Sequence, residues 1–63
     1  MFNVITNHRI NKEPVSLKEA LNLARSHIYV SEKDVERATF DLETGCQNYK
    51  IQYGFSSVWI EKA

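Results

Sequence analysis

Asp41 and Glu43 are the two residues of this sequence whose spacing most resembles an acid–base pair. Alternate residues of a strand lie on one face, so two carboxylates on such a strand would be neighbours there. Paired carboxylates can divide the roles of general acid and general base. Pairs of this kind are far more often solvated surface groups, and we therefore expect no catalysis from them.

The other reactive side chains are isolated. Cys46 follows Gly45, and Lys50 is the only cation near enough in sequence to activate its thiol. His8 and His27 have no ligand partners at useful spacing, and His27 suits the last turn of a helix, where a cation complements the helix dipole. Paired metal-binding cysteines, a phosphate-binding glycine loop and a nucleophile elbow are all absent. We expect no enzyme, no metal and no cofactor.

Three aromatic residues could either stack nucleic-acid bases or pack in the core. Tyr49 and Tyr53 share one face of a predicted strand, and Trp59 lies on the strand that follows. Aromatic side chains on a sheet can stack the bases of single-stranded nucleic acid, but that mode needs a positive surround, and only Lys50 and Lys62 are near. We favour packing against the predicted helix, with protein-binding anchors as the alternative.

Composition and charge predict one small folded domain, residues 1–63. Hydrophobic residues make up 43% and charged residues 25%, which is ordinary for a compact domain and not for a disordered chain. The formal net charge of zero argues against a general nucleic-acid binder. Residues 31–45 hold five acidic and two basic residues, whereas the first thirty hold four basic and two acidic ones. These are either two solvated surfaces or an acidic patch for a basic partner.

Several features favour the cytoplasm. The one cysteine, Cys46, cannot form an internal disulfide, and small secreted domains usually carry paired cysteines. The first nine residues lack the apolar run of a signal peptide, and no apolar stretch approaches the roughly 20 residues that span a bilayer. We therefore expect a cytoplasmic protein.

The first half of the chain predicts a strand and then a helix. Residues 2–10 are rich in strand-favouring residues, and residues 11–14 interrupt regular structure. Ser16 and Glu19 then predict a capping box, in which the serine accepts a hydrogen bond from the Glu19 amide and the glutamate side chain reaches back. One apolar stripe follows at helical spacing, made of Leu17, Ala20, Leu21, Ala24 and Ile28.

The second half predicts three strands. A short helical turn or a plain loop would occupy residues 31–37, and apolar residues then alternate with polar ones over residues 37–43. Further strands are predicted at residues 49–53 and 58–60, after turns at the two glycines. The expected fold is α+β, with one helix packed on a small antiparallel sheet in the order β-α-β-β-β, the last three strands forming a meander.

Two family resemblances bear on function. Residues 17–24, followed by Tyr29-Val30 and Val35-Glu36-Arg37, resemble the helix-to-strand segment of small phage inhibitors of bacterial RNA polymerase. That resemblance implies binding through arginines on the strand after the helix, where Arg37 takes the matching place and Thr39 stands at the second position. The layout is also similar to small anti-CRISPR proteins, which implies a phage or mobile-element protein that blocks a host machine by occupying its surface.

Together these observations predict a non-enzymatic inhibitor of a bacterial host protein complex, with anti-CRISPR action first and RNA polymerase inhibition second. A small nucleic-acid-binding domain and a homodimer that completes its sheet through an edge strand are the alternatives. The predicted partner-binding residues are Arg37, Asp41 and Glu43 on the outer face of the strand at 37–43, Glu32, Asp34 and Glu36 just before it, and Tyr49 and Tyr53.

Overall fold

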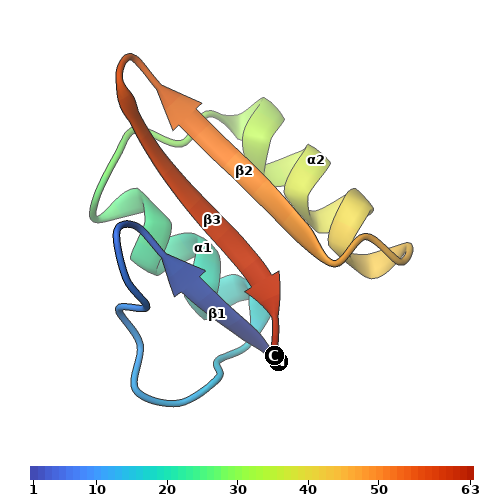
Figure 1. The fold of residues 1–63 in the computed structure, drawn as a ribbon. Helices are drawn as coiled ribbons and strands as arrows, with labels where there is room; N and C mark the ends of the chain where they lie inside the picture. The colour runs from blue at the N-terminus through green and yellow to red at the C-terminus, as the bar shows by residue number, and fades with distance from the viewer.

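Two helices cover one face of a three-stranded antiparallel sheet in the computed structural model, which describes all residues 1–63 (Figure 1). The elements in chain order are β1 (Phe2–Ile5), α1 (Leu17–Arg25), α2 (Glu32–Glu43), β2 (Asn48–Tyr53) and β3 (Ser56–Lys62). The α+β class is confirmed. The predicted order is wrong, because the chain runs β-α-α-β-β and has two helices instead of one.

The sheet has the order β1-β3-β2, so β3 is the central strand. β2 and β3 form a hairpin, and β1 pairs with the other side of β3. The hairpin loop is Gly54-Phe55, with φ of 61° at the glycine, and a glycine in this conformation at the first loop position is typical of a type II′ turn. The expected three-strand meander is therefore replaced by the β2–β3 hairpin, and the N-terminal strand, which was also expected, pairs with β3.

Residues 37–43 were expected to form a strand, and this prediction is wrong because they belong to α2. Ser31 begins the helix, since its Oγ accepts a hydrogen bond from the Asp34 amide at 3.1 Å. Ala38 and Leu42 fit the alternation of a strand, but they also lie four residues apart, on one face of a helix. The exposure of Phe40 distinguishes the helix from the strand. Phe40 is 67% exposed, whereas a strand would bury it on the same face as Ala38 and Leu42.

α1 begins as predicted. The Ser16 Oγ accepts a hydrogen bond from the Glu19 amide at 3.2 Å, which confirms the serine half of the predicted capping box, whereas the Glu19 side chain forms no return hydrogen bond. Three residues of the predicted stripe, Ala20, Leu21 and Ala24, are buried.

The first strand ends at Ile5, earlier than the predicted residue 10. The chain turns back after Ile5, so that the Ile10 amide donates to the Val4 carbonyl at 2.9 Å. At the start of β1, Phe2 and Val15 exchange two backbone hydrogen bonds of 2.7 and 2.9 Å. Residues 10–15 thus run along the outer edge of β1 and close it.

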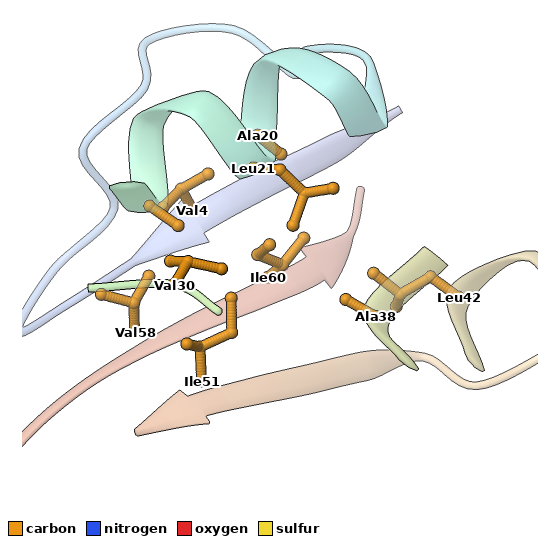
Figure 2. Close-up of a cluster of buried hydrophobic side chains, with 10 residues drawn as sticks. Val4, Ala20, Leu21, Val30, Ala38, Leu42, Ile51, Val58 and Ile60 are labelled. Atoms are coloured by element: carbon orange, nitrogen blue, oxygen red, sulfur yellow. The ribbon is translucent and has the colours of Figure 1, made fainter. Parts of the chain in front are cut away.

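The hydrophobic core lies between the helices and the sheet, and side chains from every element contribute to it (Figure 2). Its ten buried residues are Val4, Ala20, Leu21, Ala24, Val30, Ala38, Leu42, Ile51, Val58 and Ile60. The packing of Ala38 and Leu42 fixes α2 on the sheet and leaves the opposite side of that helix to solvent. Neither helix combines the length and the apolar character needed to cross a membrane.

Candidate functional site

The six charged residues predicted to bind a partner all lie on α2. They are Glu32, Asp34, Glu36, Arg37, Asp41 and Glu43. The expected outer face of a strand does not exist, and the six side chains are instead distributed around a helix. With Lys33, α2 carries five acidic and two basic residues, a net charge of −3. The acidic segment of the sequence is therefore one rigid acidic helix.

Three of these residues, Asp34, Arg37 and Asp41, act electrostatically on the hydroxyl of Tyr49 on β2. That hydroxyl donates a hydrogen bond to Oδ1 of Asp34 at 3.3 Å. Burial raises the pKa of Tyr49 above 10.0, the Asp34 carboxylate raises it further, and Arg37 and Asp41 act on it with opposite signs. We call Asp34, Arg37, Asp41 and Tyr49 the α2–β2 flank. Four of the predicted residues are thus brought together, although by a helix and a strand.

Glu43 lies elsewhere on α2. Successive residues of a helix are rotated by about 100°, so Asp41 and Glu43 are about 200° apart around the axis. Glu43 lines a shallow groove with Leu17 and Lys18 of α1. The carboxylate pair expected from the sequence is therefore not formed. Glu32 and Glu36 are exposed.

Phe40 is a surface residue that the sequence pattern placed in the core. It is 67% exposed on the solvent side of α2, between the positions of Arg37 and Glu43 along the helix. Aromatic residues, phenylalanine among them, are enriched at protein–protein interfaces. A helical period applied to residues 32–43 would have identified it, because Phe40 falls opposite the Ala38–Leu42 stripe.

The two predicted tyrosines have different environments. Tyr49 is half-buried against the core, whereas Tyr53 is 60% exposed and packs on Tyr29, with ring centroids 5.3 Å apart. Phe55 projects fully into solvent from the adjoining hairpin turn. An exposed aromatic group therefore lies at this end of the molecule.

Trp59 does not join the tyrosines, so the three-residue stacking platform is not formed. It lies on the opposite face of the sheet, where it pairs with Lys50 on one side and Ile5 on the other. The Lys50 Nζ lies 5.7 Å from the centre of the Trp59 ring, within the range of a cation–π interaction.

The surface depressions are shallow and open. The largest, of about 470 Å³, lies beside α1 and is lined by Val15, Leu23 and three polar residues. Another, of about 340 Å³, lies between the residue 6–7 turn, the end of α1 and the hairpin, with the exposed His27 among its residues. No group of three or more histidine, cysteine, aspartate or glutamate residues is arranged to hold a metal ion. Cys46 is exposed.

Comparison of the chain with known protein families, with curated proteins and with solved structures found no match. Function is therefore inferred from the residues of this chain alone.

Proposed function

We propose that this chain is a small non-enzymatic protein-binding domain whose contact surface is the outer side of α2 together with the α2–β2 flank. The observation that carries the proposal is the exposed Phe40 on an acidic helix that Ala38 and Leu42 anchor to the core. A helix held in this way presents its outer side chains from a backbone that need not be ordered on binding.

The chemistry of the surface suits a basic partner. An aromatic side chain surrounded by charges is typical of an interface anchor, which loses water at its centre while the charges remain at the rim. A net charge of −3 on α2 would steer a positively charged surface towards it and disfavour acidic partners.

The more specific proposal is inhibition of a bacterial host complex in the cytoplasm by a phage or mobile-element protein, with a CRISPR effector as the first target. Its support is the small size of the chain and the acidic helix, which suits the basic grooves of nucleic-acid-binding machines. The observed order β-α-α-β-β removes the similarity of layout from that support. Host RNA polymerase is the second target, and there Arg37 lies on a helix instead of the matching strand.

A comparative pull-down tests the proposal. The wild-type chain, a Phe40→Glu variant and a His8→Ala variant are immobilised and exposed to bacterial lysate at physiological salt. His8 is exposed in the turn after β1 and serves as the matched control. We expect one set of proteins to be retained by the wild type and by His8→Ala and to be lost with Phe40→Glu. Equal retention by all three, or retention of nucleic acid alone, would contradict the proposal.

A further inference from the structure

We propose that the open edge of β2 binds an extended basic segment of the partner as a fourth strand of the sheet. This inference rests on the proposed function and names the chemistry of the partner segment. The two edges of the sheet differ in whether their backbone groups are already paired.

The edge formed by β1 is closed by the chain itself. Phe2 exchanges backbone hydrogen bonds with Val15, and the Val4 amide donates to Oδ1 of Asn11 at 2.9 Å. Asn11 is buried, and its Nδ2 donates to the Glu13 carbonyl at 2.7 Å. An added strand therefore finds no free backbone groups on this side.

The edge formed by β2 is open. Tyr53 and Ser56 are the pair that closes the hairpin turn, and such a pair exchanges backbone hydrogen bonds across the two strands. Every second residue of β2 before Tyr53, namely Ile51 and Tyr49, therefore also directs its N–H and C=O groups at β3. The remaining residues, Asn48, Lys50 and Gln52, direct their N–H and C=O groups away from β3. None of the backbone hydrogen bonds outside the helices and strands involves them, and all three residues are exposed. Such an edge is a template for an added strand.

Charge identifies the kind of segment that would bind there. Seen from the uncovered face of the sheet in Figure 1, α2 runs beside the outer edge of β2, on the side away from β3, and α2 contacts β2. An added strand would direct alternate side chains towards this helix and so towards Asp34 and Asp41, two carboxylates that outnumber the one cation of the flank, Arg37. Lysine or arginine at those alternate positions would complement the flank.

A second copy of the chain suits this edge less well. Pairing β2 with its own copy would bring two α2 helices, each with a net charge of −3, to the same interface. The symmetric register centred on Lys50 would also place two lysines directly opposite, which is destabilising. A basic segment of another protein avoids both costs.

A peptide titration with a matched pair of variants tests the inference. The probe is a short capped peptide in which lysine alternates with valine and threonine, titrated into isotope-labelled protein at low salt. We expect shifts at the amides of Asn48, Lys50 and Gln52 and none along β1. Gln52→Pro removes an outward N–H that the fold does not use, whereas Gln52→Ala keeps it. We expect the proline variant to bind about tenfold more weakly than the alanine variant.

The charge of the flank is tested separately. Asp41→Asn should weaken binding of the lysine peptide about threefold at low salt and reduce its salt dependence. The same peptide with glutamate in place of lysine should not bind. Asp34 is unsuitable for this test, because its carboxylate also accepts hydrogen bonds from Ser31 and Tyr49.

Four results would overturn the inference. In the titrations these are equal binding by the Gln52→Pro and Gln52→Ala variants, equal binding of the lysine and glutamate peptides, and amide shifts confined to the β1 edge. The fourth is a dimer of the free chain that Gln52→Pro abolishes. The pull-down distinguishes failure of this inference from failure of the proposed function. If Phe40→Glu loses the partner and Gln52→Pro retains it, α2 binds the partner and the β2 edge does not.

Discussion

The Tyr49 hydroxyl on β2 donates a hydrogen bond to Oδ1 of Asp34 on α2 at 3.3 Å. The other oxygen of the same carboxylate accepts from the Ser31 Oγ at 3.1 Å, and the Asp34 amide donates back to that Oγ. One carboxylate thus connects the start of the helix to the sheet. This connection orients the flank from which we infer function.

The first prediction concerns alkaline pH. The pKa of Tyr49 is raised above 10.0, so the folded state holds its proton more tightly than the unfolded chain does. The stabilisation is complete below about pH 10 and is lost as the pH rises through the pKa of the folded state, because the unfolded chain deprotonates first. Urea unfolding between pH 8 and about pH 11 should show a falling free energy of unfolding.

Tyr49→Phe should reduce the fall in the free energy of unfolding at alkaline pH. Tyr53→Phe, which removes an exposed hydroxyl, should reduce that fall less. An equal fall in both variants would show that other groups are responsible.

The second prediction tests the assignment of α2. If residues 37–43 were a strand, Phe40 and Leu42 would share its buried face and both alanine substitutions would be costly. In the helix, Leu42 is 1% exposed and Phe40 is 67% exposed. Leu42→Ala should lower the free energy of unfolding by about 2 to 5 kcal/mol, and Phe40→Ala should change it by no more than about 0.5 kcal/mol. Chemical denaturation measures the free energy of unfolding of both variants. Similar large losses in both would favour a strand at residues 37–43 over the helix.

The third prediction concerns Asn11. Its substitution by alanine leaves the buried Val4 amide without a partner and opens the edge of β1. We expect a loss of about 1 to 3 kcal/mol in the free energy of unfolding and faster hydrogen exchange at the Val4 amide. Asn22→Ala, at an exposed position of α1, is the control and should have little effect. Unchanged exchange at Val4 would contradict this role for Asn11.

Local signals predicted the first helix well, because its capping box and its apolar stripe coincide. They failed for α2, since Ala38 and Leu42 satisfy the strand period and the helical period equally. The cap formed by Ser31 and Asp34 begins α2 in the structure, whereas the sequence predicted only a short helical turn or a plain loop at residues 31–37. The closure of β1 by Asn11 has no local signature, because it depends on the return of residues 10–15 in three dimensions.

The candidate site was predictable in composition and not in geometry. The excess of acidic charge in residues 31–45 was visible in the sequence. The separation of Asp41 from Glu43 and the exposure of Phe40 follow from the helical period, so both were hidden by the strand assignment.

The fourth prediction uses this geometry to refine the interface. Arg37→Ala and Asp41→Ala should leave the melting temperature nearly unchanged, because surface charges contribute little to folding. In a desolvated interface each could cost about 2 kcal/mol of binding free energy. Glu43→Ala lies on the α1 side of the helix and should bind as the wild type does. Affinity measurements on the purified complex decide this, and a loss confined to Glu43→Ala would move the interface towards α1.

Site-specific photo-crosslinking tests the central claim, that the outer side of α2 contacts a protein partner. A photoreactive phenylalanine analogue is placed at Phe40 and, in a separate protein, at His8, and both are irradiated in bacterial lysate. We predict a discrete protein adduct from position 40 that the unlabelled wild-type chain suppresses by competition, and none from position 8. An adduct only from position 8, or no competed adduct from position 40, would contradict the claim.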